Sequence, residues 1–150
     1  MKSHLFMWAR MTFKQHVTIT TALSLLLGFF WKNYLGVMLF WLGGIFIDVD
    51  HYLDYVRGTG DVRISLRRME KFFSSLQGYK FYCFFHSYEL IVLLSLLNFF
   101  YLRKDYLYGL LAGFVVHIIL DVVFNNVKIR CYLFLYRLKH SFEAEKLFVK

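Results

Sequence analysis

The sequence predicts an all-α integral membrane protein, a four-span helical bundle with interfacial amphipathic helices. Hydrophobic residues make up 59% of the 150 positions, and proline is absent. The mean hydropathy is +0.49, which is more apolar than an ordinary soluble domain of this size. Four apolar stretches alternate with short or basic links. We expect a single membrane domain over residues 1–150, with spans at about 15–31, 34–55, 81–102 and 106–124.

The first two spans follow from apolar runs of different length. The run Val17–Trp31 is short for a bilayer crossing, which needs about 20 residues, so the span is extended back through His16. The second run, from Tyr34 to about Tyr55, contains Gly43 and Gly44, which permit close contact with a neighbouring helix. Only Lys32 and Asn33 separate the two runs, so we expect an antiparallel hairpin.

The third and fourth spans form a second expected hairpin. They cover Phe81–Leu102 and Tyr106–Phe124 and are joined by a very short link. Gly109, Ala112 and Gly113 give the last span a face of small residues that another helix can approach.

The distribution of positive charge predicts the orientation. Of the 18 Lys and Arg residues, only Lys32, Arg103 and Lys104 lie in the two short links. The other 15 precede the first span, lie in the central loop or follow the fourth span. Because cytoplasmic loops are enriched in Lys and Arg, both termini and the central loop are expected in the cytoplasm. The expected location is the inner (cytoplasmic) membrane of a bacterium, with several passes.

The basic segments on this side are expected to contact lipid. Residues 61–77 mix apolar and basic positions in an imperfect amphipathic pattern, which predicts an interfacial helix above the polar ends of the spans. The tail, residues 128–150, has a similar pattern. The expected partners are membrane lipids with anionic headgroups. Nucleic acid is not an expected partner, because the positive charges adjoin the spans. The oligomeric state is left open.

Histidines and acidic residues cluster at the same end of all four spans. They open the first and third spans and close the second and fourth, so antiparallel crossings bring them to one membrane face. Ionisable residues within a membrane are costly and usually functional. His117 and Asp121 lie four residues apart and share a helix face. The candidate metal ligands are His16, Asp48, Asp50, His51, His86, His117 and Asp121.

Imidazole and carboxylate ligands suit a divalent ion, with zinc expected and manganese possible. Glu89 and Asp50 are the candidate catalytic bases. Ser87 is a candidate hydrogen-bonding partner of a ligand, and Arg67 and Arg68 are candidate substrate-binding residues. The alternative for His117 and Asp121 is a buried hydrogen bond that staples two helices. The two cysteines are too few for a disulfide framework and are expected to be free thiols.

The order of these motifs resembles a known family. An early His, then Gly-Gly-x-x-x-Asp-x-Asp-His, His-Ser and His-x-x-x-Asp, all among short apolar spans, is similar to the YdjM-like bacterial inner-membrane proteins, described as metal-dependent hydrolases. The resemblance covers about residues 14 to 125, although Ile47 stands where that family usually has proline. The pattern also has a distant similarity to zinc-dependent phospholipase C and single-strand nucleases, which are all-helical.

Two classes of function remain open at this point. The first is an enzyme, a membrane-bound metal-dependent hydrolase acting on a phosphoester at the cytoplasmic leaflet. The second is a non-enzymatic membrane adaptor or assembly factor with a structural metal or polar site. A metal transporter fits less well, because the outer halves of the spans contain few polar residues.

Overall fold

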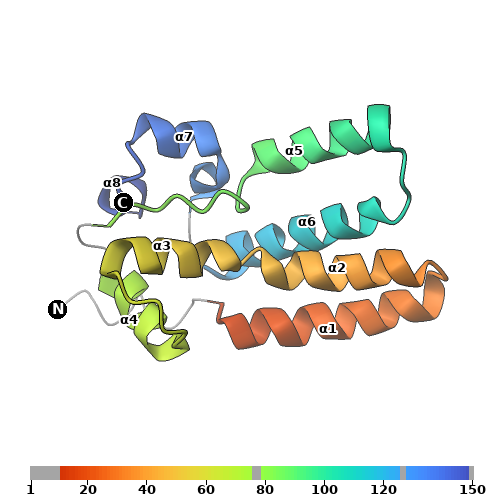
Figure 1. The fold of residues 1–150 in the computed structure, drawn as a ribbon, viewed down its shortest axis with the longest axis horizontal. Helices are drawn as coiled ribbons and strands as arrows, with labels where there is room; N and C mark the ends of the chain where they lie inside the picture. The colour runs from red at the N-terminus through yellow and green to blue at the C-terminus, as the bar shows by residue number, and fades with distance from the viewer. Residues whose placement is uncertain (1–10, 76–78, 126–127, 149–150) are drawn as a thin grey trace.

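The computed structural model describes residues 11–75, 79–125 and 128–148. All regular elements among these residues are helices, which confirms the predicted all-α class. Long helices lie side by side in the order α1, α2, α6 and α5, and shorter helices gather at one end (Figure 1). The long elements are α1 (Phe13–Phe30), α2 (Tyr34–Phe46), α5 (Tyr88–Leu97), the π-helical η2 (Asn98–Leu102) and α6 (Leu107–Phe124).

The shorter elements at that end include α3 (Val49–Thr59), which continues α2, and α4 (Leu66–Ser75). The C-terminal part contributes η3 (Ile129–Tyr132), α7 (Phe134–Lys139) and α8 (Ala144–Phe148). Helix α4 lies within the segment predicted to be interfacial.

Local capping sets the starts of the long helices. Thr12 and Gln15 form a capping box at the start of α1, and Asn33 accepts a hydrogen bond from Gly36 N at the start of α2. Ser87 caps α5 by accepting from Leu90 N. Helix α5 therefore begins at Tyr88, and residues 81–87 are not helical although the expected span began at Phe81.

Glycines bring α2 and α6 into direct backbone contact. A Cβ atom added to Gly109 would lie 1.9 Å from the Gly36 carbonyl oxygen, and one added to Gly113 would lie 2.3 Å from the Phe40 carbonyl oxygen. Side chains larger than hydrogen would force the two helices apart. This close approach also places the backbone of Gly44 beside the side chains of α6.

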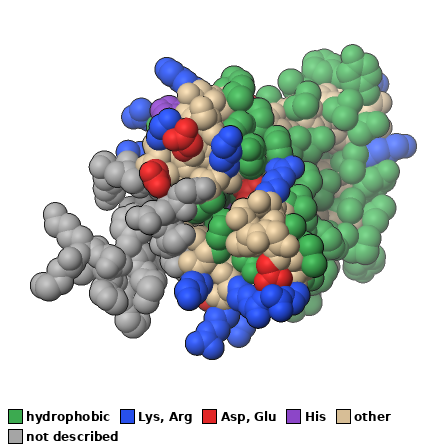
Figure 2. Space-filling view, turned by 60° about the vertical axis from the view of Figure 1, so that its left-hand side comes forward, with side chains coloured by type: hydrophobic (Ala, Val, Ile, Leu, Met, Phe, Trp, Pro, Cys, Tyr) green, Lys and Arg blue, Asp and Glu red, His purple; other side chains and the backbone are tan. Residues whose placement is uncertain are grey.

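The membrane prediction is supported only in part. Two helices are long and apolar enough to cross a bilayer, Tyr34–Thr59 and Leu107–Phe124, and the apolar helix Tyr88–Leu102 is shorter. Hydrophobic side chains cover one half of the surface in Figure 2, whereas most Lys and Arg side chains gather at the other end. This polar end contains α3, α4 and the C-terminal helices.

Candidate metal centre

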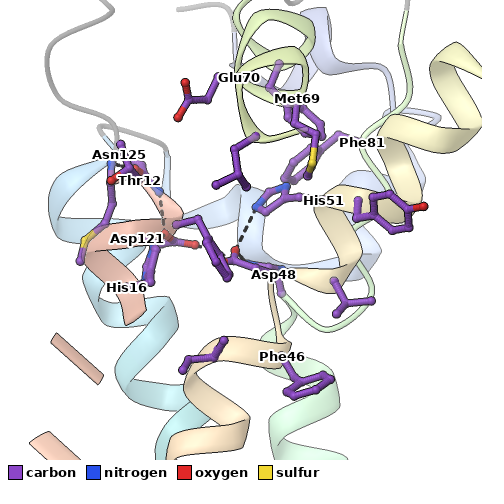
Figure 3. Close-up of a pocket in the computed structure, with 18 of the residues that line it drawn as sticks. Thr12, His16, Phe46, Asp48, His51, Met69, Glu70, Phe81, Asp121 and Asn125 are labelled. Carbon is purple, nitrogen blue, oxygen red and sulfur yellow. Dashed lines mark hydrogen bonds and ion pairs between the residues drawn. The ribbon is translucent and has the colours of Figure 1, made fainter. Parts of the chain in front are cut away.

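The histidines and aspartates meet at the polar end of the bundle, as the alternation of the helices predicts. His16 lies in the first turn of α1, and Asp48 lies between α2 and α3. His86 precedes α5, and His117 and Asp121 occupy the last two turns of α6. Figure 3 shows the labelled members of this cluster, from α1, α6 and the α2–α3 junction, pointing toward a common space.

Three atoms of this cluster form a compact triangle, here called the donor triangle. Asp48 Oδ1 lies 3.7 Å from His86 Nε2 and 3.4 Å from His117 Nε2, and the two nitrogens are 3.3 Å apart. A tetrahedral zinc ion with bonds of about 2.0–2.1 Å holds its ligands about 3.3–3.4 Å from one another. Asp121 Oδ2 lies 3.6 Å from each of the same nitrogens. The spacing therefore matches that of ligands around one small ion.

The hydrogen-bond partners of the two imidazoles favour a proton on the outward nitrogen, Nδ1, of each ring. His117 Nδ1 lies 2.8 Å from the Gly44 carbonyl oxygen, which can only accept, so Nδ1 carries the proton. His86 Nδ1 likewise lies 3.4 Å from Asp50 Oδ2. In the neutral rings both Nε2 atoms then present lone pairs to each other. Two lone pairs at this distance repel unless a positive charge lies near them. The donor set thus fits a cation, with the protonated nitrogens oriented as in known metal-bound histidines.

Two buried polar atoms at the cluster also fit this assignment. Asp48 Oδ2 and His16 Nδ1 make no hydrogen bond within the described part of the chain. Buried polar atoms usually have a partner, because leaving one without costs about 1–3 kcal/mol. A bound ion with its water would satisfy such atoms.

His16 supports Asp121. Its Nε2 lies 3.0 Å from Asp121 Oδ1, and its ring stacks on that of His117 with centroids 3.9 Å apart. Asn125 Nδ2 also donates to Asp121 Oδ1. These contacts leave Asp121 Oδ2 directed at the imidazole pair. His16, His117 and Asp121 also offer a group of atoms that could hold an ion.

His51 approaches the triangle from α3. Its Nε2 lies 3.7 Å from Asp48 Oδ1, and its Nδ1 lies 3.5 Å from Cys83 Sγ. His51, Cys83 and His86 form a third group that could hold an ion. No sequence pattern associates Cys83 with the centre, because Lys80 is the only charged residue near it on its N-terminal side.

The loop that contains His86 is held by two carboxylates of α3. Asp50 Oδ2 accepts hydrogen bonds from the backbone N–H groups of Phe85 and His86, and Asp54 Oδ2 accepts from those of Tyr82 and Cys83. Asp50 therefore lies behind His86 rather than in the donor triangle. Asp54 is also buried, with 2% of its surface exposed, so both carboxylates act on the loop from within the protein.

Arg137 holds the same loop from the opposite side, and the sequence pattern does not single it out. Its side chain is fully buried, and its Nη1 donates to the His86 carbonyl oxygen at 3.0 Å. Burial lowers the pKa of the guanidinium. The backbone of the loop is therefore bound through its N–H groups by α3 and through a carbonyl group by α7.

The remaining predicted site residues lie away from the triangle. Glu89 accepts hydrogen bonds from Phe134 N and Leu135 N at the start of α7, so its carboxylate supports the C-terminal helices. Because α5 begins at Tyr88, His86 and Glu89 do not share a helix face. The Ser87 hydroxyl caps α5. Arg68 Nη1 pairs with Asp61 at 2.7 Å and does not line the cavity described next, which Arg67 does.

A cavity of about 930 Å³ opens from the cluster toward α4. His16, Asp48, His51, His86 and Asp121 line its polar part. In Figure 3, Met69 and Glu70 of α4 lie across the cavity from Asp48 and Asp121. The volume falls within the range of about 300–1,000 Å³ typical of small-molecule sites. A ligand in the cavity can therefore contact Asp48, His86 and Asp121, whereas His117 does not line the cavity.

Replacing Asp50 by asparagine is expected to weaken zinc binding by about 10- to 100-fold, because the charge that orients His86 is lost while the side-chain shape remains. Competition against a chromophoric zinc chelator measures the affinity. Asp105→Asn, an exposed aspartate at the opposite end, is the matched control. Equal affinities for the two variants, with unchanged melting temperatures, would show that Asp50 does not act on the centre.

Comparisons with known proteins do not assign the chain to a family. No protein-family model matches the chain, and no curated protein or solved structure matches it. The resemblance of its motifs to the YdjM-like family accordingly stays a prediction.

Proposed function

We propose that this protein is a membrane-bound metal-dependent hydrolase that acts on a phosphoester at the cytoplasmic leaflet. The observation that supports this most directly is the donor triangle beside an open cavity. Structural zinc sites are closed by four protein ligands, whereas catalytic sites keep a position for water or substrate. The two imidazole nitrogens and Asp48 Oδ1 form such an incomplete set, and the cavity reaches Asp48 and His86.

The proposal includes four membrane crossings and cytoplasmic placement of the polar end, in the inner membrane of a bacterium. The two long apolar helices support part of it. Outward-facing side chains of α1 and of α5 with η2 add support, since Phe29 is 81% exposed and Tyr101 is 79% exposed. Water would solvate such large side chains poorly. The excess of Lys and Arg at the polar end agrees with the positive-inside rule.

The three ligands we assign are Asp48, His86 and His117, and the Asp121 carboxylate lies beside them, 3.6 Å from both imidazole nitrogens. His16 and His51 support these ligands from either side. Zinc suits imidazole and carboxylate donors at this spacing, and manganese would be the second choice. A bound divalent ion would acidify a coordinated water and polarise a phosphoryl oxygen.

A carboxylate of the protein would accept the proton, and basic side chains would bind the negatively charged substrate. Asp48 lines the cavity and its Oδ2 has no hydrogen-bond partner among the described residues, so we assign this oxygen as the proton acceptor. It replaces Glu89 and Asp50 as the proposed base, because those two carboxylates hold backbone N–H groups. Arg67, Lys71 and Lys128 line the cavity and would attract a phosphate. Hydrolysis would add the water oxygen to phosphorus and release the alcohol with a proton.

The test is recovery of activity after metal removal. Purified protein is treated with chelator and assayed on a panel of phosphomonoesters and phosphodiesters, then reloaded with zinc or manganese. We expect hydrolysis to disappear on chelation and to return with the metal. A protein that takes up stoichiometric zinc but hydrolyses no member of the panel would contradict the enzyme proposal and favour a structural site.

A further inference from the structure

The cavity beside the donor triangle is amphipathic. Its polar part is the His/Asp cluster described above, and most of its remaining lining is apolar. These apolar residues come from α1, α2, α3, α4 and the segments flanking α4 and α5. They include Phe13, Phe46, Val49, Ile64, Met69 and Phe73. A small soluble phosphoester would leave this surface in contact with water, whereas a hydrocarbon chain would cover it.

A divalent ion at the donor triangle would give the cavity a net positive charge. Among the described residues its lining has three basic side chains, Arg67, Lys71 and Lys128, and three acidic ones, Asp48, Glu70 and Asp121, so the ion's charge would favour an anion. The chain as a whole has a formal net charge of +8. Figure 2 shows the Lys and Arg side chains gathered at this end of the molecule. A phosphate would meet positive charge at the rim of the cavity and the donor triangle at its base.

The apolar wall continues to the hydrophobic outer surface. Phe46, at the end of α2, lines the cavity and is 59% exposed, and Val49 lines it while remaining partly exposed. Both residues belong to the helix Tyr34–Thr59, which is apolar and long enough to cross a bilayer. A chain lying along Phe46 would therefore pass from the cavity to the surface that faces lipid in the proposed orientation.

We infer that the ligand of this cavity is a lipid phosphate, with its phosphate at the donor triangle and its hydrocarbon chain along Phe46 and Val49. The inference rests on the proposed function, since it names the substrate class of the same centre. It differs from surface attraction to anionic headgroups, because it requires that the chain enter the protein.

Non-hydrolysable alkylphosphonates of increasing chain length test the inference without turnover. Their binding to zinc-loaded protein is measured by calorimetry in one detergent. Each added methylene should tighten binding by about fourfold while the chain extends along the wall. Phe46→Ala should reduce this dependence on chain length. Phe99→Ala is the matched control, since Phe99 is 63% exposed, lies in η2 at the other end and does not line the cavity.

A second pair of variants tests the phosphate end. Arg67→Gln should weaken binding of every alkylphosphonate by about two- to fivefold at low ionic strength, because a partly screened charge is lost. Arg68→Gln should change it much less, since Arg68 pairs with Asp61 outside the cavity.

The outcomes separate this inference from the proposed function. Equal affinities for methyl- and octylphosphonate would overturn the lipid inference and leave the hydrolase intact. An equal loss in Phe46→Ala and Phe99→Ala would assign the chain effect to the detergent micelle and also overturn it. Chain-dependent binding that is specific to Phe46, with no hydrolysis of any lipid phosphate, would support the ligand class and contradict the enzyme.

Discussion

Replacing His117 by alanine is expected to remove bound zinc from the purified protein. His117 supplies one corner of the donor triangle, and its ring is fixed by the Gly44 carbonyl group at 2.8 Å. Sites of three or four ligands tolerate the loss of one poorly, so affinity should fall by more than about 100-fold. Mass-spectrometric metal analysis of freshly purified protein gives the result directly.

The control for this variant is His140→Ala. The His140 ring lies in the C-terminal part, where its Nδ1 bonds the Tyr136 carbonyl oxygen, so its loss should leave the metal content unchanged. Full zinc occupancy in His117→Ala would place the metal elsewhere. Absence of metal from the parent protein, with no uptake on addition, would identify the cluster as a hydrogen-bonded staple between helices.

Asp121→Asn is expected to abolish hydrolysis while the bundle remains folded and inserted in the membrane. The substitution keeps the side-chain shape but replaces a charged carboxylate by a neutral amide. Because Asp121 Oδ2 lies 3.6 Å from both imidazole nitrogens, the loss of charge acts at the centre itself. The rate should fall by at least about 100-fold, which exceeds the effect of removing a supporting residue.

Steady-state rates and the melting temperature are measured on the same Asp121→Asn sample, with Asp105→Asn as the control. A lost rate with a retained melting temperature supports the catalytic assignment. A large fall in melting temperature with metal still bound would instead favour the adaptor or assembly factor that the sequence left open.

The sequence predicted at which end of the helix bundle the site lies, because this position depends only on the direction in which each helix runs. Apolar runs joined by links as short as Lys32–Asn33 can only form antiparallel hairpins. His16, Asp48, His117 and Asp121 therefore had to meet at one end. The i, i+4 spacing of His117 and Asp121 likewise fixed their common helix face, and the structure brings their side chains within 3.6 Å.

The sequence did not predict the path of the loop before α5. Apolar residues such as Phe81 and Phe84 extend the hydrophobic run, yet the Ser87 cap delays the helix and leaves His86 on a loop. That loop is stabilised by tertiary contacts with Asp50, Asp54 and Arg137, which no local pattern encodes. The partners of Glu89, which are backbone N–H groups of α7, could not be predicted for the same reason.

The contacts that build the centre join parts of the chain that are synthesised far apart in time. His16 meets Asp121 across 105 positions, and Arg137 reaches the His86 carbonyl group across 51. Before α6 and α7 have emerged from the ribosome, neither Asp121 nor Arg137 is available for these contacts. The loop of His86 then has no support from α7, and the imidazole pair lacks its second member. In the proposed function, metal uptake would therefore be a late step in biogenesis, after the segment through residue 137 has emerged and docked.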